Sequence, residues 1–509
     1  MQNILLNIDA GTVDWSRAQF ALTAIYHWLF VPLTLGLAVI MGIVETRYYR
    51  TKDAFWKQAA QFWQRLFGIN FAMGVATGII LEFEFGTNWS NYSWFVGDIF
   101  GAPLAVEGIV AFFVESTFVA VMYFGWNKVS RGFHLASTWL TGLGATISAW
   151  WILVANAWMQ YPVGCQFNPD TMRNEMVSFA EVALSPFAVS KFLHTVTSAW
   201  IIGGVFCVAV CCWYLLKKRE TRLALESMKI GAAVGLFAAV LAAATGHKSA
   251  QDVAAVQPMK LAAMEALHDG GNGQGLKIIE GIEVPYALSF MATNDFNGYV
   301  PGINDLLNGY TRADGTQEPS AEEKIERGRQ AIEALAAYRK AKAEGADEAT
   351  LSPLLSSLSS NMKYFGYGYV KDKSELVPPI AVNFWAFRVM VGMGCLFILF
   401  FAVILAAVYK FPKRLWQKYD VTALPSWHYW VAIALVPLGY IASESGWLVA
   451  EFGRQPWTIQ DMLPTWVSVS DIPASSVMLT FFLFLVLFTT MLAVEINIML
   501  KQIKKGPEA

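Results

Sequence analysis

Long apolar runs alternate with shorter polar segments along most of the chain. A helix needs about 20 predominantly apolar residues to cross the hydrocarbon core of a bilayer, and the runs reach that length. They lie near residues 18–45, 66–87, 102–126, 133–158, 187–216, 227–246, 381–409, 426–451 and 474–500. The pattern predicts an all-α integral membrane protein with nine transmembrane helices.

Basic residues are concentrated in every second short connection. Two of them, Lys217 and Lys218, follow the fifth run. The opposite set of short connections offers only Arg17, Arg173 and Arg454. Because basic connections stay on the cytoplasmic side of a membrane, we expect the N-terminus outside and the C-terminus in the cytoplasm.

One connection breaks the alternation of apolar runs and short loops. Residues 247–380 are polar and charged, fall on the outer side, and are too many for a simple connector. Within them, Ala321–Thr350 has acidic residues first and basic residues later, as a solvated helix would. The chain thus divides into six helices (1–246), an extracytoplasmic insert (247–380) and three helices (381–509), and the insert is either a substrate-binding element or a passive cap.

Composition agrees with a membrane protein. Of 509 residues, 55% are hydrophobic and 15% are charged, whereas soluble proteins carry about 25% charged residues. The formal net charge of −2 and the absence of a basic patch give no sign of a nucleic-acid partner. Five cysteines without a CxxC or CxxCH spacing indicate neither a zinc site nor covalent haem attachment.

The third apolar run contains two carboxylates, Glu107 and Glu115. A charged side chain near the bilayer centre costs roughly 2.5–3.5 kcal/mol. Eight residues turn an α-helix about 80° past two full turns, so both acids lie on broadly one side. Two such groups along one face indicate a proton route or a buried ligand set.

Five possible ligands lie at a similar depth in the outer third of the predicted spans: His27, Glu107, His194, Met390 and Glu451. A methionine in an apolar span is usually a packing residue, and a lone histidine is more often hydrogen-bonded than ligating. However, Arg388 lies two residues before Met390, and an intramembrane arginine needs an anionic partner. A haem offers iron to the thioether and propionates to the guanidinium, so a low-spin haem between His194 and Met390 is plausible.

Deeper in the bilayer, Glu115 and Ser148 lie near the predicted midplane. A carboxyl and a hydroxyl beneath a cluster of outer ligands are arranged as a proton route from the cytoplasm would be. The alternative is a pair that only satisfies its own hydrogen bonds.

Several stretches resemble subunit I of the cytochrome bd quinol oxidases, from about residue 16 to the last span. They include SRAQFALTAIYHWLFVPLTLG (16–36), LFGINFAMGVATGIILEFEFGTNWS (66–90), VGDIFGAPLAVEGIVAFFVESTF (96–118), VQPMKLAAMEA (256–266), AFRVMVG (386–392) and GWLVAEFGRQPW (446–457). The insert resembles the long form of the family's outer loop, the Q-loop.

The resemblance implies a role for each candidate residue. His194 and Met390 correspond to the axial ligands of low-spin haem b. The ligands around high-spin haem b and haem d, not assigned to one haem each, correspond to His27, Glu107 and Glu451. Other matching positions are Trp447 beside the haems, Arg388 and Arg454 as electrostatic supports, Glu115 and Ser148 on a proton path, and Lys260 and Glu265 in the quinol-oxidation motif.

The resemblance also implies an activity and a set of partners. Quinol would be oxidised at the outer side, and O₂ would be reduced to water with cytoplasmic protons, so a proton-motive force would arise without pumping. The implied partners are ubiquinol or menaquinol, O₂, a second large subunit, a small single-span subunit and membrane lipid. The implied location is the bacterial cytoplasmic (inner) membrane.

Three other classes compete with this interpretation. A haem–copper oxidase would need a cluster of buried histidines for copper, and His27 and His194 are too few. A proton-coupled transporter would explain Glu107 and Glu115 without haem, but it would not explain His194 and Met390 at matching depth. A purely structural membrane subunit would not need so many buried ionisable groups.

Overall fold

A computed structural model describes residues 9–312, 314–416 and 419–507. Within these residues, nine helical segments are long and apolar enough to cross a membrane, as the hydrophobic pattern predicts. They are α1 (Ala10–Thr51), α2 (Ala54–Thr87), the continuous α3 (Ser90–Val106), η1 (Glu107–Ala111) and α4 (Phe112–Phe124), α5 (Arg131–Gln160), α7 (Pro186–Leu216), α8 (Thr221–Val256), α14 (Ile380–Tyr409), α16 (Ser426–Phe452) and α18 (Ala474–Lys505).

The helices extend beyond the apolar runs that predict them. The sixth run ends near residue 246, yet α8 continues to Val256. Polar side chains on this extension have their own partners, since Gln251 Nε2 donates to Asn294 Oδ1 at 2.6 Å. The apolar run therefore marks the part of a helix that suits lipid, not the whole hydrogen-bonded helix.

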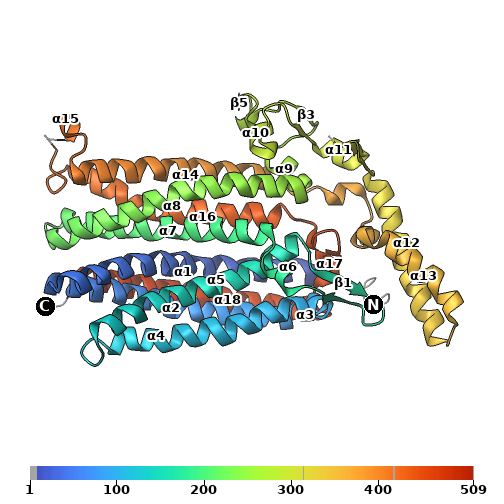
Figure 1. Ribbon diagram of the computed structural model, residues 1–509, viewed down its shortest axis with the longest axis horizontal. Coiled ribbons are helices and arrows are strands. Elements are labelled where there is room, and N and C mark those ends of the chain that lie inside the picture. Colours follow the sequence, from blue (N-terminus) through green and yellow to red (C-terminus); the bar gives the residue numbers. More distant parts are fainter. Residues whose placement is uncertain (1–8, 313, 417–418, 508–509) are drawn as a thin grey trace.

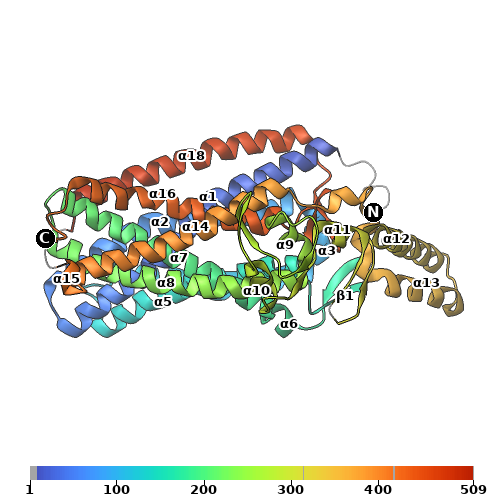
Figure 2. The same ribbon diagram turned by 90° about the horizontal axis from the view of Figure 1, so that it is seen from above.

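The long helices form two packed groups (Figure 1). The first group contains α1, α2, α3–α4, α5 and α18, with α18 along one edge beside α1 (Figure 2). The second group contains α7, α8, α14 and α16. The groups meet where α1 packs on α7, and a Cβ added at Gly36 would lie only 2.6 Å from Gly203 Cα. Paired glycines therefore let the two backbones touch.

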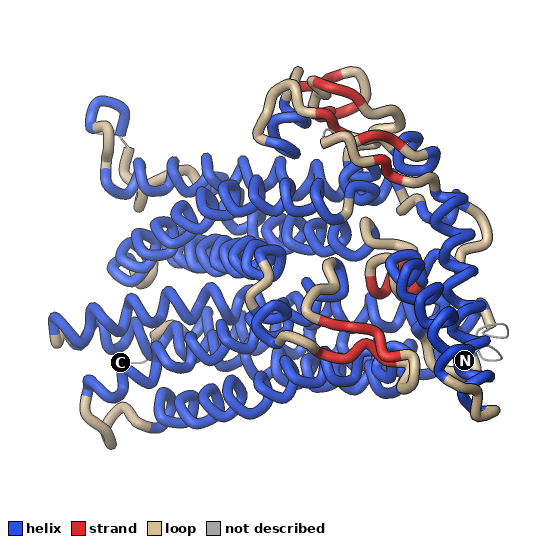
Figure 3. Tube along the Cα trace, turned by 45° about the vertical axis from the view of Figure 1, so that its right-hand side comes forward, coloured by secondary structure: helices blue, strands red, loops and turns tan. Residues whose placement is uncertain are grey.

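The segment between α8 and α14 forms a mixed cap over one end of the bundle, called the insert end below (Figures 1 and 3). The beginning of α1 lies at this end and the last turns of α18 lie at the opposite end. The helices of the cap are α9 (Pro258–Met264), α10 (Ala287–Thr293), α11 (Ile303–Asn308), α12 (Ala321–Ala343), α13 (Glu348–Asn361), η2 (Met362–Tyr369) and η3 (Lys373–Leu376). Its strands are β3 (Gly271–Asn272), β4 (Leu276–Ile279), β5 (Ile282–Val284), β6 (Tyr299–Val300), β7 (Tyr310–Thr311) and β8 (Gln317–Glu318).

All described strands pair antiparallel in two-stranded units, β3 with β6, β4 with β5 and β7 with β8. Two further units lie outside the insert, β1 (Cys165–Asn168) with β2 (Arg173–Met176) and β9 (Trp457–Ile459) with β10 (Leu463–Pro464). The remaining short helices are α6 (Phe179–Ala183), α15 (Lys413–Trp416) and α17 (Thr465–Ser468).

The single solvated helix predicted over Ala321–Thr350 is two helices. The first, α12, ends at Ala343, and Gly345 follows with a φ of +78°. Asp347 then caps α13 by accepting a hydrogen bond from the Thr350 backbone N–H. The charge pattern identified the helix correctly but missed this glycine stop and N-cap, which are the usual signals of a helix boundary.

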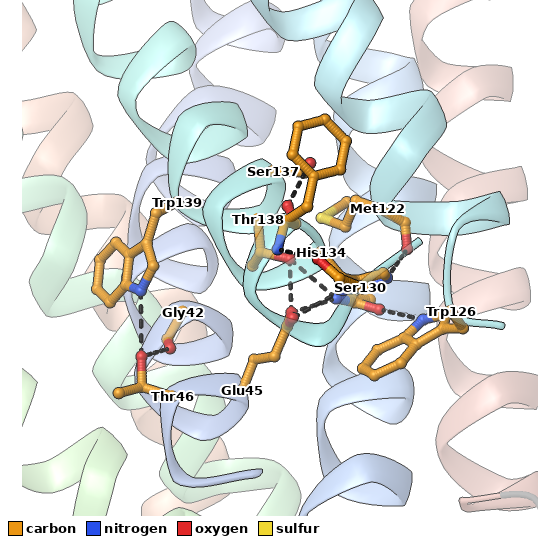
Figure 4. Close-up of polar contacts among 12 residues, drawn as sticks. Gly42, Glu45, Thr46, Met122, Trp126, Ser130, His134, Ser137, Thr138 and Trp139 are labelled. Carbon is orange, nitrogen blue, oxygen red and sulfur yellow. Dashed lines mark hydrogen bonds and ion pairs between the residues drawn. The ribbon is translucent and has the colours of Figure 1, made fainter. Parts of the chain in front are cut away.

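A buried polar cluster joins α1, α2 and α5 near the end of the bundle opposite the insert (Figure 4). Glu45 Oε1 lies 2.7 Å from His134 Nδ1, and Glu45 Oε2 accepts from Thr138 and Gln64 at 2.5 and 3.1 Å. The other ring nitrogen, Nε2, lies 3.1 Å from the carbonyl oxygen of Met122, which can only accept. Glu45 and His134 are 1% and 2% exposed, so each satisfies a group that would otherwise be costly to bury.

We predict that Glu45→Gln destabilises the folded bundle by about 3–5 kcal/mol, because it leaves one member of a buried pair without the other. Unfolding of the detergent-solubilised protein by guanidinium measures this loss. Asp53→Asn is the matched control, since Asp53 pairs with Arg222 at the surface and its amide can still cap α2. Equal stability of both variants would show that the cluster carries no such energy.

Candidate functional site

The candidate ligand His194 is oriented by the neighbouring helix α8. Its Nδ1 lies 3.1 Å from the Ala242 carbonyl oxygen and 3.3 Å from Thr245 Oγ1. A Cβ added at Gly246 would lie 3.1 Å from the His194 Cε1 atom. Because Nδ1 is engaged, Nε2 is the nitrogen that could bind iron, which is the usual arrangement of a ligating histidine.

Met390 has a similar position on the other side of the second helix group. It lies on α14, and a Cβ added at Gly446 of α16 would lie 3.1 Å from the Met390 sulfur. The helices α7, α8, α14 and α16 pack in a ring, α7 on α8, α8 on α14, α14 on α16 and α16 on α7. His194 and Met390 therefore come from helices that are not neighbours in the ring.

The third nitrogen or sulfur candidate, His27, repeats this pattern between α1 and α2. His27 Nδ1 lies 3.0 Å from Thr77 Oγ1, and a Cβ added at Gly78 would lie 3.1 Å from the ring. Each of the three candidate ligands thus has a glycine against its imidazole ring or sulfur. Glycines leave room for a flat macrocycle beside a ligand, and an engaged Nδ1 fixes each imidazole. The donor set consequently fits haem.

The third span contains a π-helical turn at the first of its two acids. In η1 the Phe112 N–H bonds to the Glu107 carbonyl, an i→i+5 pairing that accommodates one extra residue. Eight residues separate Glu107 and Glu115, so with the extra residue they are related as residues seven apart, within about 20° of each other. The two acids therefore share a face more closely than a regular α-helix would allow.

The two acids contact α5 at successive turns. Ser148 Oγ donates to Glu107 Oε1 at 2.7 Å. Glu115, 7% exposed, lies beside Gly144, where an added Cβ would be 2.7 Å from its Cγ. Ser148 is thus bonded to Glu107, which argues against the alternative in which Ser148 and Glu115 only pair with each other. Antiparallel packing of α4 on α5 brings Gly144 to Glu115 instead.

Glu451 lies at the centre of a polar cluster at the insert end. It accepts from Asn156 Nδ2 at 3.1 Å and forms an ion pair with Arg454 at 2.6 Å. Arg454 also donates to the Thr458 carbonyl, while its Nε is buried without a partner among the described residues. An unpaired buried guanidinium N–H suits an anionic group such as a haem propionate.

Trp447 connects this cluster to the first helix group. Its ring packs edge-on against Trp28 of α1 at 5.1 Å, and the ammonium of Lys191 lies 5.5 Å from its centroid. The His27 helix and the Glu451 helix are therefore in direct contact through two indole rings.

Arg388 has a partner that the sequence did not predict. Its Nη2 donates to Glu265 Oε2 at 2.7 Å, and it also donates to the carbonyl oxygens of Met264 and Lys277. The expected anionic partner was a haem propionate, but the guanidinium is saturated by the insert. Burial raises the pKa of Glu265 to about 7, and the charge of Arg388 opposes this rise.

Lys260 and Glu265, the two residues of the quinol motif, have separate partners. Glu265 follows α9 and pairs with α14, whereas Lys260 Nζ donates to Gln160 and Gln257 at 2.6 and 2.8 Å. Lys260 is 2% exposed, and burial lowers its pKa well below the usual range. Five residues turn a helix by about 500°, so the two side chains point in nearly opposite directions from α9.

Sequence reasoning missed several buried or half-buried polar groups. They are Glu84, which accepts from Thr23, together with Asn156, Gln160, Lys191, Glu444 and the Glu45–His134 cluster. Each is a polar residue within or beside an apolar run, and that isolation is the signal that could have found them. Among the described residues, no three His, Cys, Asp or Glu side chains gather closely enough to hold a metal ion, so the copper site of the haem–copper alternative has no counterpart there.

Comparison with known proteins decides the family. A family model described as cytochrome bd terminal oxidase subunit I matches residues 15–507. The chain belongs to this family. It is 40% identical to the cytochrome bd-II ubiquinol oxidase subunit 1 of Escherichia coli, over 98% of this chain and 97% of that protein. It is 34% identical to the cytochrome bd ubiquinol oxidase subunit 1 of Bacillus subtilis, over 97% and 94%.

The fold is also that of a solved member of the family. The bd oxidase structure from Geobacillus thermodenitrificans superposes with a TM-score of 0.77, covering 98% of this chain and all of that chain at 21% identity. Membership in the cytochrome bd family implies haem cofactors, a quinol substrate, a partner subunit II and a place in a bacterial respiratory membrane.

Proposed function

We propose that the chain is the haem-bearing subunit of an electrogenic quinol:O₂ oxidoreductase. Quinol is oxidised at the insert end, which faces outward, and O₂ is reduced to water with protons from the cytoplasm. The observation that carries the proposal is the set of three thioether or imidazole side chains, His27, His194 and Met390, each held against a glycine. A proton-coupled transporter has no use for such sites.

The orientation follows from the charge of the connections. Lys217, Lys218 and Arg219 lie at the end of the bundle opposite the insert. Basic connections stay in the cytoplasm, so the insert (residues 247–380 in the predicted division, with 1–246 before it and 381–509 after it) lies outside, together with the N-terminus.

The candidate residues divide into those that hold haem and those that position the haem ligands. His194 and Met390 hold low-spin haem b, and His27, Glu107 and Glu451 surround high-spin haem b and haem d. When bound, these haems supply one-electron redox chemistry and the site for O₂. Trp447 and Arg454 position the ligands, because Trp447 packs on α1, which carries His27, and Arg454 pairs directly with Glu451. Arg388 ties α14, which carries Met390, to the insert through Glu265.

The chain's own acids carry the protons. Glu265 accepts a proton from quinol, which is ubiquinol or menaquinol. Lys260, the other residue of the quinol-oxidation motif, orients the quinol head group. Ser148 and Glu115 pass cytoplasmic protons to Glu107 along the contact between α4 and α5. Release and uptake on opposite sides moves one charge per electron against about 2.3 kcal/mol per 100 mV. Subunit II and a small single-span subunit complete the enzyme against its lipid-facing helices.

His194→Ala should abolish the reduced-minus-oxidised absorption of the low-spin haem, since no other described side chain replaces the imidazole held by α8. Met390→Ala should change the same band. Difference spectra of the purified oxidase measure both, and His428→Ala is the control because His428 lies at the exposed start of α16. Intact low-spin bands in His194→Ala would reject the ligand assignment.

The rate of quinol oxidation should fall as the pH drops through about 7, because Glu265 accepts a proton only when it is ionised. Arg388→Leu removes a charge that lowers the pKa of Glu265, so this acidic limb should move to higher pH. Arg388→Lys keeps the charge and should move the limb less. The pH profile of kcat is the measurement, and a limb that stays in place in Arg388→Leu argues against Glu265 as the acceptor.

Glu115→Gln should slow turnover by about 100-fold, a loss expected when a proton-transfer group is removed, while all haem bands remain. Glu495→Gln is the control, since Glu495 is also a buried carboxylate but lies on α18. Oxygen consumption with excess quinol measures both. Equal rates would indicate that cytoplasmic protons do not pass Glu115.

A further inference from the structure

A continuous hydrogen-bonded network runs through the insert end, and Lys260 lies at its centre. In one direction, Lys260 donates to Gln160, Gln160 to Asn156 at 3.0 Å, and Asn156 to Glu451. In the other direction, Lys260 donates to Gln257. Gln257 donates to Gln460 and Gln460 to Asp461, both at 2.9 Å.

The direction of every hydrogen bond in this network follows from the lysine at its centre. A lysine nitrogen donates to both glutamines, so each must turn its carbonyl oxygen toward Lys260 and its NH₂ group away. Each amide then needs an acceptor beyond it, and the chain ends only where a group accepts without donating. Both ends, Glu451 and Asp461, are carboxylates. Every amide of the network therefore has both its oxygen and its nitrogen engaged, with a nitrogen at the centre and an acid at either end.

A polar cavity of about 150 Å³ lies along the Asp461 arm of the network. Lys260, Gln257, Gln460 and Asp461 line it, as do several charged side chains of the insert, Arg312, Glu318, Lys324 and Lys363. A water molecule occupies about 30 Å³ of liquid, so the cavity has room for several. The cavity runs from the protein interior to its surface, since its lining includes Lys260, which is 2% exposed, and the Arg312 side chain, which is 46% exposed.

Asp461 is held firmly at this cavity. Tyr367 donates to its Oδ1 at 2.8 Å, and its carbonyl accepts from the Gly366 N–H at 3.0 Å. Its backbone φ is +62°, an uncommon conformation for a residue other than glycine that usually persists only where the surroundings enforce it. A Cβ at Gly366 would lie 2.5 Å from the Asp461 carbonyl oxygen, so the close approach requires glycine.

We propose that the cavity is the outer exit for a proton released by quinol, with Lys260 as its entrance and Asp461 as the group that passes the proton to the outer solvent. This rests on the proposed quinol oxidation. Oxidation of quinol breaks two O–H bonds: one proton goes to Glu265, as proposed above, and the other goes to the Lys260 amine, while the two electrons leave through the proposed haems. The resulting Lys260 ammonium passes that proton through cavity water to the Asp461 carboxylate. Asp461 then releases the proton outside and is ionised again.

The charges around the two groups suit this exchange. Burial lowers the pKa of Lys260 and raises that of Asp461, so both move toward neutral pH. Lys260 faces Lys191 and Arg454, which oppose its charge, and Glu451, which favours it. Asp461 faces Tyr367, Gln460, Lys324 and Lys363, all of which favour its ionised form. The cations of the insert thus help Asp461 give up its proton.

The decisive variant is Asp461→Asn, assayed in the complete oxidase in liposomes with quinol and a pH-sensitive dye outside. Turnover and outer proton release should both fall by about 100-fold with unchanged haem spectra, and Asp461→Glu should restore them. Asp170→Asn is the matched control, because Asp170, like Asp461, accepts from a tyrosine (here Tyr338) and from one further side chain (here Lys342), but it is exposed and lies outside the cavity. Normal release in Asp461→Asn would overturn the proposal.

A second variant separates proton release from a merely structural role. Tyr367→Phe keeps the carboxylate but removes a bond that lowers the pKa of Asp461, so the pH profile of turnover should move upward. A loss of stability with an unmoved profile would show that Asp461 only fastens its loop to η2. If the unmodified enzyme shows no haem bands that quinol can reduce, the proposed function itself fails. If those bands are present and Asp461→Asn releases protons as the unmodified enzyme does, only the proposed exit fails.

Discussion

An ionisable group buried in this bundle is costly unless it finds a partner within the protein, because lipid offers none. That constraint explains why the buried acids and bases occur in sets. Glu45 lies against His134, Glu107 against Ser148, and Glu451 against Arg454. Each set joins at least two helices or a helix and a loop, so the polar contacts fix how apolar helices are placed relative to one another.

Small residues supply the complementary condition. Glycines bring α1 and α7 into backbone contact and also leave space against His27, His194 and Met390. The first use draws two helix groups together, and the second keeps selected places between helices from closing. A bundle that binds large planar cofactors needs both, because uniform close packing would exclude the cofactor.

The sequence predicted the number of spans. It also predicted a set of candidate residues, but not most of the partners that the structure gives them. Hydrophobic length depends on the chain alone, so the spans could be read directly. The pairing of Arg388 with Glu265 depends instead on how the insert folds back onto α14 across more than a hundred residues. The bond of Ser148 to Glu107 depends on antiparallel register between α4 and α5. The π-helical turn leaves no signal in composition at all.

That turn has a consequence for the whole third span. One residue accommodated in η1 acts as a change of phase: every position after it is rotated by about 100° relative to a regular helix. The phase decides which side chains of α4 meet α5 and which meet lipid or a neighbouring subunit. Deleting a single residue there would leave the apolar character of the span intact while turning the face that meets α5 by about 100°. Sequence length in this stretch is therefore under a stricter constraint than sequence identity.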